Sequence, residues 1–183
     1  GARMLRHYGS ADLRARYLER LTVTDMDALC QGTQWMTEKT GGSDVGAATT
    51  VARQDADGAW RLWGDKWFCS NANADIAFTL ARPEGAPPGT AGLAMFLVPK
   101  VLPDGTRNPL TLNRLKEKFG SRSMASAEVT YAGAVAYPVG DRTAAGPREF
   151  KIAADLGFST AVTTRPGVIF PQHSNHLTAL PRI

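Results

Sequence analysis

The feature that most constrains the fold is a series of short segments after Thr33, each bounded by turn-forming residues. The segments are rich in β-branched and aromatic residues, or they alternate apolar with polar side chains as at Ile76, Phe78 and Leu80. They cover residues 48–53, 60–63, 66–70, 76–82, 93–100, 110–116 and 128–135, with turn residues at 57–58, 85–89 and 103–106. Many short strands at this spacing are typical of a β-sandwich or a β-barrel. The sequence therefore predicts a mainly β domain in which residues 83–89 form a flexible hairpin tip.

Helical patterns flank the predicted strands on both sides. Between residues 4 and 21, apolar residues recur at three- and four-residue steps, with a break after which Ser10 or Asp12 can cap a second helix. Residues 147–159 show another helical pattern, with proline near its start and glycine near its end. Beyond residue 160, prolines exclude a long helix, so we expect an irregular tail.

The composition limits the kinds of protein that this chain can be. Its 183 residues suffice for one ordinary domain, and 43% apolar with 21% charged residues argues against wholesale disorder. A formal net charge of +4 suits an anionic ligand such as a nucleotide or a CoA thioester, and no Lys/Arg cluster is longer than that at 114–122. Two cysteines give no disulfide framework, which favours a reducing, cytoplasmic location. No apolar run reaches the roughly 18 residues needed to span a membrane, and no signal peptide is visible.

The stretch with the most chemical content is the Gly-rich turn at residues 35–46, WMTEKTGGSDVG. Glycines let the backbone turn sharply and approach a ligand, and successive N–H groups in such a turn can form an anion-binding concavity. One interpretation is a phosphate cradle in which Gly42 has a positive φ and follows a strand that ends at Thr37. The alternative is a hairpin whose Ser43 and Asp44 satisfy their own turn. The sequence is neither a P-loop nor a dinucleotide-binding Gly-x-Gly-x-x-Gly.

Three ordered motifs resemble the middle domain of the acyl-CoA dehydrogenase flavoprotein family. The turn matches the family's TE-x-x-GGSD, residues 64–71 (GDKWFCSN) match its G-x-K-x-(W/F)-x-(T/S)-N strand, and residues 116–123 (KEKFGSRS) match its K-x-G-x-R-x-S segment. The detailed wording is most similar to the alkylation-response (AidB-like) branch. The resemblance implies a small antiparallel β-barrel that binds FAD at residues 31–140. It also implies the end of an N-terminal helical domain at 1–30, and the start of a C-terminal helical domain with an off-pattern tail at 141–183.

The resemblance also implies which residues hold the cofactor FAD. These are Met36, Thr37, Gly42, Ser43, Phe68 and Ser70. Thr37 and Ser70 correspond to hydroxyls beside the flavin ring, Phe68 to an aromatic residue against its face, and Met36 to a backbone neighbour of the ring. Gly42 and Ser43 correspond to positions near the pyrophosphate or the phosphates of the thioester.

Strand geometry adds an expectation about the aromatic pair at this motif. Successive residues of a strand point to opposite faces, so either Trp67 or Phe68 is expected in the core. This expectation follows from the residues alone and does not depend on the resemblance.

No catalytic residue and no metal site is assigned within this chain. Glu38 and Asp44 form a carboxylate pair by sequence, but the resemblance implies that Glu38 belongs to the turn. It also implies that the catalytic base is a glutamate of the C-terminal helical domain. The His-x-x-His at 173–176 lacks a third metal ligand. The basic residues at 116–122 either bind phosphate or form a solvated strand face.

The function implied by the resemblance is that of an FAD-dependent oxidoreductase fragment. The intact enzyme would remove a Cα proton and a Cβ hydride from an acyl-CoA thioester, and it would be a homo-oligomer. The chain begins without Met and in mid-pattern, so we expect a fragment. Because the resemblance places the catalytic base in the C-terminal helical domain, we expect that this fragment does not turn over acyl-CoA by itself. Two alternatives stay open, namely an alkylation-response flavoprotein that binds and protects duplex DNA, and an inactive truncated product.

Overall fold

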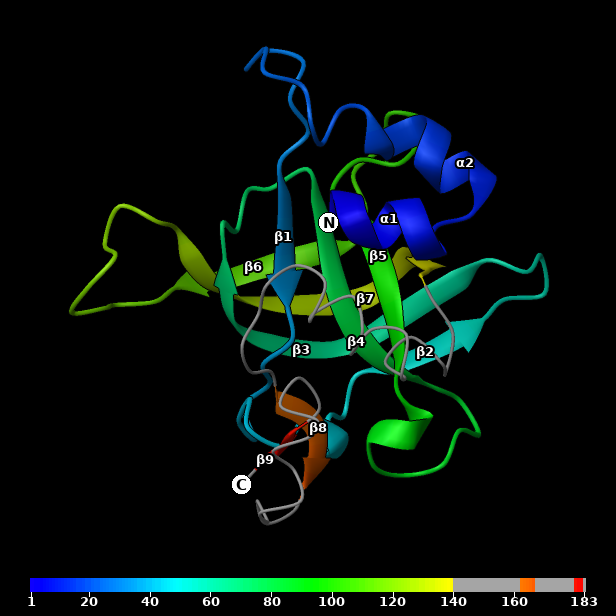
Figure 1. The fold of residues 1–183 in the computed structure, drawn as a ribbon, viewed down its shortest axis with the longest axis vertical. Helices are drawn as coiled ribbons and strands as arrows, with labels where there is room; N and C mark the ends of the chain where they lie inside the picture. The colour runs from blue at the N-terminus through cyan, green and yellow to red at the C-terminus, as the bar shows by residue number, and fades with distance from the viewer. Residues whose placement is uncertain (140–161, 167–179, 183) are drawn as a thin grey trace. The chain divides into compact units, whose positions relative to one another are not determined.

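The structure is a computed structural model that describes residues 1–139 and the strand backbones at 162–166 and 180–182. The chain forms two units, Gly1–Gly140 and Asp141–Ile183, which are described separately. In the first unit (Figure 1), the helical segments are α1 (Ala2–Tyr8), α2 (Ala11–Leu13), the π-helical η1 (Arg14–Leu18), and the short 3₁₀ turns η2 (Val45–Ala47) and η3 (Thr90–Gly92). Its strands are β1 (Gly32–Trp35), β2 (Val51–Gln54), β3 (Trp60–Ser70), β4 (Ile76–Pro83), β5 (Ala94–Pro99), β6 (Leu110–Leu115) and β7 (Ser126–Pro138).

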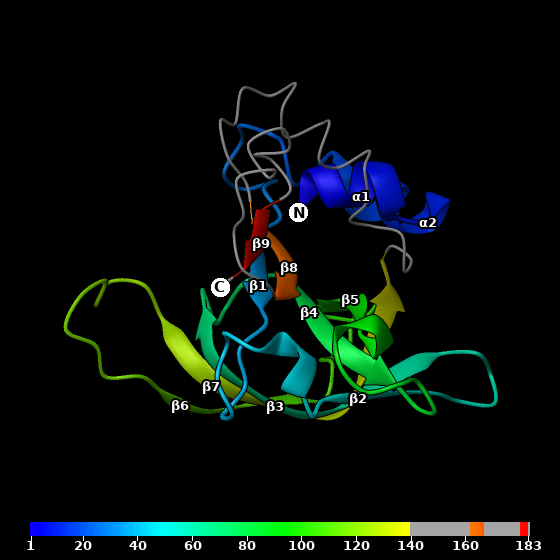
Figure 2. The same ribbon diagram turned by 60° about the horizontal axis from the view of Figure 1, so that its bottom comes forward.

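The strands of the first unit close into a barrel. β4 pairs with both β2 and β5, and β3 and β7 complete the ring in the order β4-β2-β3-β7-β5. β1 extends the sheet beside β4, and β6 extends it beside β7. Figures 1 and 2 show β3 and β7 running side by side over their length. The prediction of a small, mainly β barrel is therefore confirmed.

Two pairings differ from an antiparallel barrel. β1 runs parallel to β4, with Gly32 opposite Ile76, and β2 runs parallel to β4, with Val51 opposite Arg82. The chain order explains both. A long connection separates β1 from β4, which parallel neighbours require. Between β2 and β4 the chain runs back along β3, which is antiparallel to β2, so β4 again has the direction of β2.

The strand β3 is longer than the sequence pattern indicates. The pattern predicts separate strands at 60–63 and 66–70, whereas β3 runs unbroken through Gly64 and Asp65. β7 pairs with it along this whole length, and the register shifts after Leu62 and after Lys66. Pairing with the long strand β7 thus keeps β3 continuous through Gly64, where the sequence pattern indicates a break. The two register shifts are irregularities that let the strands stay paired on both sides of it.

The strand β4 separates two apolar cores. Side chains on one face of a strand alternate with those on the other. Ala77 and Ala81 belong to the barrel interior, together with Trp35, Leu62, Cys69, Phe96, Val98, Val129 and Tyr131. Ile76 and Phe78 belong to a second cluster with Leu5, Leu13, Tyr17, Leu97 and Val139. This second cluster is what holds α1 and its neighbours over β4 and β5 in Figure 1.

The N-terminal helical segment breaks where the sequence predicts. α1 ends at Tyr8, and the Ser10 hydroxyl accepts a hydrogen bond of 3.2 Å from the Leu13 backbone N–H at the start of α2. Of the two predicted caps, Ser10 is therefore the one used. The assignment of residues 1–30 to a separate helical domain stays a prediction.

The second unit is described only by its strand backbones. β8 (Val162–Pro166) and β9 (Leu180–Arg182) pair in parallel, so the expectation of an irregular tail is wrong at these residues. The predicted helix at 147–159 and the histidines at 173–176 lie outside the described residues. In the described part of the chain, no helix combines the length and apolar character that a membrane crossing requires.

Candidate functional site

The candidate site lies where the chain leaving β1 crosses the end of β3. The Trp67 backbone N–H donates a 2.7 Å hydrogen bond to the Thr37 carbonyl. Farther along the crossing, the Thr33 hydroxyl and the Trp35 indole N–H donate to the Ser70 carbonyl at 2.7 and 2.9 Å. These bonds bring Thr37 and Ser70, which lie far apart in the sequence, onto neighbouring stretches of backbone.

The hydroxyl groups of Thr37 and Ser70 are available to a ligand. Both residues are half-buried. Within residues 1–139, neither hydroxyl makes a hydrogen bond, although the backbone carbonyls of both residues do. A half-buried hydroxyl without a protein partner can bond either water or a ligand, so the two at this crossing are able to donate to an external acceptor.

Phe68 projects from this crossing in an unusual conformation. Its φ is +52° and its side chain is 55% exposed, and the β3–β7 register shifts between Lys66 and Cys69. The expectation that Trp67 and Phe68 take opposite faces is wrong, because the irregular backbone breaks the alternation there. Their rings lie 6.1 Å apart in an edge-to-face arrangement, and neither is in the core.

The Gly-rich turn begins with a tight reversal directly after Thr37. The Gly41 N–H donates to the Glu38 carbonyl at 2.9 Å, and Gly41 has a φ of +115° with open space around it. The prediction of a positive φ at Gly42 is wrong, because Gly41 makes the reversal. Gly42 is restricted in another way, since a Cβ there would lie 2.7 Å from the Thr37 Oγ1.

The rest of the turn agrees in part with each interpretation of the sequence, the phosphate cradle and the self-satisfied hairpin. Asp44 satisfies its own turn, because its carboxylate accepts a 3.0 Å hydrogen bond from the Gly46 N–H. Ser43 is exposed, and its hydroxyl makes no hydrogen bond within residues 1–139. The hairpin interpretation therefore describes Asp44, while Gly41, Gly42 and Ser43 present a free surface beside Thr37.

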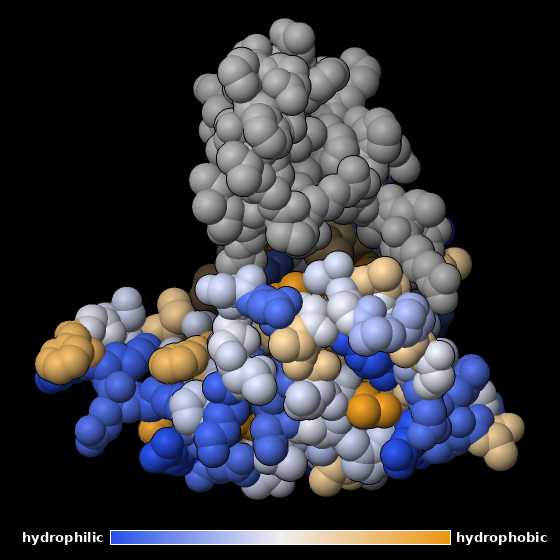
Figure 3. Space-filling model, turned by 90° about the horizontal axis from the view of Figure 1, so that it is seen from below, coloured by the Kyte–Doolittle hydropathy of each residue, from blue (hydrophilic) through white to orange (hydrophobic). Residues whose placement is uncertain are grey.

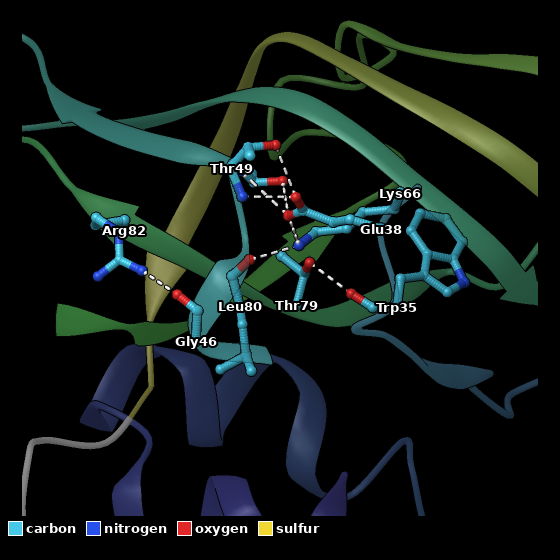
Figure 4. Close-up of polar contacts among 9 residues, drawn as sticks. Trp35, Glu38, Gly46, Thr49, Lys66, Thr79, Leu80 and Arg82 are labelled. Carbon is cyan, nitrogen blue, oxygen red and sulfur yellow. Dashed lines mark hydrogen bonds and ion pairs between the residues drawn. The ribbon is translucent and has the colours of Figure 1, made fainter. Parts of the chain in front are cut away.

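A buried ion pair joins the start of the Gly-rich turn to β3 (Figure 4). The Lys66 Nζ lies 2.6 Å from the Glu38 Oε1, and the two side chains are 0% and 3% exposed. The backbone N–H and hydroxyl groups of Thr49 and Thr50 donate to the same carboxylate, and Lys66 also donates to the Leu80 carbonyl at 2.8 Å. The pair thereby ties the turn to β3, to β4 and to the start of β2.

Burial alone would raise the pKa of Glu38, but its partners outweigh this effect. Hydrogen bonds from Lys66, from the Thr50 hydroxyl and from the Thr49 amide lower that pKa to about 2. Glu38 is therefore a fixed carboxylate without capacity for proton transfer near neutral pH. Sequence reasoning did not find its partner Lys66, because 28 residues separate the two and only the closed barrel brings them together.

Arg82 contacts the segment that the sequence analysis described as a flexible hairpin tip. Its guanidinium donates to the Gly46 carbonyl at 2.8 Å and to the Gly89 carbonyl at 2.9 Å, and it also donates to the Pro87 carbonyl. Figure 4 shows the bond to Gly46, at the end of the Gly-rich turn. These bonds link the tip to the turn, and the expectation that the tip is flexible stays a prediction.

The basic residues at 116–122 lie in the loop between β6 and β7 and bond both to the loop itself and to β7. Lys118 donates to the Met124 carbonyl at 2.7 Å, and Arg122 donates to the Lys118 carbonyl at 2.8 Å. Phe119 and Met124 are exposed in the same loop, and Figure 3 shows apolar and hydrophilic surface side by side at this end of the unit. The segment is therefore not a regular strand face, and phosphate binding by its cations stays a prediction.

Met36 connects the site to the second core. The residue is half-buried, and it packs against the cluster that includes Ile76, Phe78 and Leu97. Its backbone therefore lies between Trp35, which is in the barrel core, and Thr37 of the site. This position is compatible with a role through its backbone.

Four of the described carboxylates around the site have partners. Glu38 is bound to Lys66, Asp44 to Gly46, and Glu128 to Arg114 and Lys116. Asp75 accepts from the Gln31 N–H at 2.8 Å. A general base must be able to accept a proton near neutral pH, so Glu38 and Glu128, whose pKa values are lowered to about 2, are not suitable candidates.

Comparison with known proteins identifies the family. Residues 33–134 match the family model described as "Acyl-CoA dehydrogenase, middle domain". The chain therefore belongs to the acyl-CoA dehydrogenase family.

Individual relatives agree with this assignment. The AidB protein of Escherichia coli (strain K12) is 48% identical over 105 residues, which are 57% of this chain and 18% of AidB. Acyl-CoA dehydrogenase family member 11 of Caenorhabditis elegans is 39% identical over 140 residues, 74% of this chain and 23% of that protein. The resemblance to the AidB-like branch is thus confirmed.

A solved structure shows the same fold. Caenorhabditis elegans ACDH-11, solved in complex with C11-CoA, superposes with a TM-score of 0.70 at 37% identity, over 76% of this chain and 25% of that one. The present chain accordingly spans about a quarter or less of these relatives.

Proposed function

We propose that this chain is the FAD-binding middle domain of an acyl-CoA dehydrogenase-like oxidoreductase. The observation that carries the proposal is the pair of half-buried hydroxyls, Thr37 and Ser70, without protein partners in residues 1–139, at the same strand crossing as the exposed Phe68. A flavin ring offers an aromatic face and a polar edge with hydrogen-bond acceptors. The three side chains are complementary to both.

Each proposed contact has a chemical reason. The hydroxyls of Thr37 and Ser70 would donate to the acceptor edge of the ring, which tunes the electronics of the cofactor. Phe68 would pack against its face, and the Met36 backbone would lie next to it. The open backbone at Gly42 and the free Ser43 hydroxyl would receive phosphate oxygens of the FAD or of the thioester. When bound, FAD supplies a hydride acceptor.

The substrate proposed for the intact protein is an acyl-CoA thioester. Family membership supports this class, and the ACDH-11 structure was solved with C11-CoA. Glu38 and Glu128 of the barrel are held in ion pairs, which supports the expectation that the catalytic base comes from another part of the intact protein. We also propose that the intact protein is a homo-oligomer.

The experiment is a titration of the 183-residue chain with FAD, followed by amide NMR. We expect weak binding, because a barrel alone leaves one side of the ring open to water. The shifts should concentrate at residues 36–43 and 67–70. Shifts confined to other surfaces, or no shifts at all, would refute the proposal. A parallel titration with duplex DNA at two salt concentrations tests the DNA-binding alternative, whose affinity would fall steeply with salt.

A further inference from the structure

Lys116 occupies an unusual place beneath the aromatic pair of the candidate site. It follows directly after β6, and its ammonium nitrogen lies 3.3 Å from the centre of the Trp67 ring and 4.8 Å from that of Phe68. The side chain is only 9% exposed. A cation this close to two ring faces is attracted by their quadrupoles, more strongly where water is largely excluded. The contact is therefore a packed element of the site.

The position of Lys116 is fixed from the opposite side by a carboxylate. Glu128 on β7 is 14% exposed and contacts both Lys116 and Arg114. Hydrogen bonds from Arg114 and from Lys116 hold the pKa of Glu128 at about 2, so it is ionised at any ordinary pH. The backbone of Lys116 is fixed too, because its N–H donates to the Ser126 carbonyl at 2.7 Å.

Phe68 needs such a support. A bulky residue at a φ of +52° lies in the sparsely populated left-handed region, and such a backbone persists only where its surroundings enforce it. With its side chain 55% exposed, Phe68 has little core packing to do so. Within the described residues, two groups contact the Phe68 ring. They are the Trp67 ring, in an edge-to-face arrangement, and the Lys116 ammonium.

We propose that Lys116 is a positioning residue that holds Phe68, through Trp67, as an exposed aromatic platform for the cofactor ring. The chain of support runs from Glu128 through Lys116 to the two rings. The structural part of this inference stands on the contacts alone, and only its consequence for FAD rests on the proposed function.

The test compares two substitutions that each remove one cationic partner of Glu128. Lys116→Met keeps most of the aliphatic stem and removes the ammonium, while Arg114 still neutralises Glu128. Arg114→Met is the matched control, because it leaves Lys116 on the rings. The readouts are the ring-to-ring NOEs between Trp67 and Phe68 and the amide–Hα coupling of Phe68, which reports its φ. We expect both to change in Lys116→Met and to persist in Arg114→Met and in Lys116→Arg.

Unchanged NOEs and coupling in Lys116→Met would overturn the inference. If that variant does not fold, the wild-type protein still tests the contact between Lys116 and the two rings. The ring currents of Trp67 and Phe68 must shift the NMR signals of the Lys116 ε-methylene protons upfield. Ordinary lysine shifts there would equally overturn it.

The functional consequence is measured separately by FAD titration. If FAD binds the wild-type chain at Phe68, Lys116→Met should weaken it by about 5-fold, the equivalent of one lost cation–π contact. An affinity equal to that of Arg114→Met would contradict the functional role. If FAD does not bind at Phe68, the proposed function fails, while the NOE comparison still decides the structural role of Lys116.

Discussion

Replacing Lys66 by Met tests the reasoning about the buried ion pair. The substitution leaves the Glu38 side chain, 3% exposed, without the cation that lies 2.6 Å away. Removing one partner of a buried pair costs about 3–5 kcal/mol of unfolding free energy, because the other charge stays buried and uncompensated. Since domains are stable by only about 5–15 kcal/mol, the loss is a large fraction of the total. For a chain of this length it corresponds to a fall in melting temperature on the order of 10 °C.

The assay is urea unfolding followed by tryptophan fluorescence, which reports on the buried Trp35. The matched control is Arg53→Met, because Arg53 pairs with Glu84 at 3.2 Å on the surface, with side chains 53% and 66% exposed. An exposed pair contributes roughly 0–1 kcal/mol. The double variant Glu38→Leu with Lys66→Met should recover much of the loss, since it removes both charges. If Lys66→Met costs no more than Arg53→Met, the reasoning about the pair is refuted.

Other predictions concern pH, the turn and the chemistry. The pKa of Glu38 lies at about 2 against an ordinary 4.5, so its stabilising contribution is fully present above pH 4.5 and is lost as the pH falls toward 2; urea midpoints that do not fall over that range in wild type more than in Glu38→Gln would contradict this. Gly42→Val should weaken FAD binding more than it lowers the melting temperature, because its Cβ would meet the Thr37 hydroxyl at the proposed ligand surface; equal loss of both would favour the plain hairpin. Ser70→Ala should shift the flavin reduction potential of the intact protein, and an unchanged potential with an unchanged flavin spectrum would remove Ser70 from the site. The isolated chain should not bleach added FAD anaerobically with any acyl-CoA, and bleaching would show that a barrel carboxylate acts as the base.

Local patterns predict most of the strands of this fold and the position of the turn. β4, β5 and β6 lie within a residue or so of their predicted ranges, because alternation and turn residues are encoded locally. The parallel pairings of β4 and the continuity of β3 depend on which strands become neighbours. No local pattern carries that information.

The site residues divide in the same way. The turn and the Phe68 motif are visible as motifs, whereas their supports are not. Lys66, Arg82 and Lys116 each act across a long sequence separation, on Glu38, on Gly46 and on the rings of Trp67 and Phe68 respectively. The left-handed backbone at Phe68 reverses what strand alternation predicts, because the irregular pairing with β7 is a property of the assembled sheet.

The two-sided burial of β4 has a practical consequence for how this protein can be cut. The family match begins at residue 33, which invites truncation just before β1. Such a cut would remove Leu5, Leu13 and Tyr17 and leave the outer row of β4, Ile76 and Phe78, facing water. An exposed apolar surface of that kind promotes aggregation. The smallest well-behaved piece is therefore expected to retain the N-terminal helical segment, because that segment covers the outer row of β4.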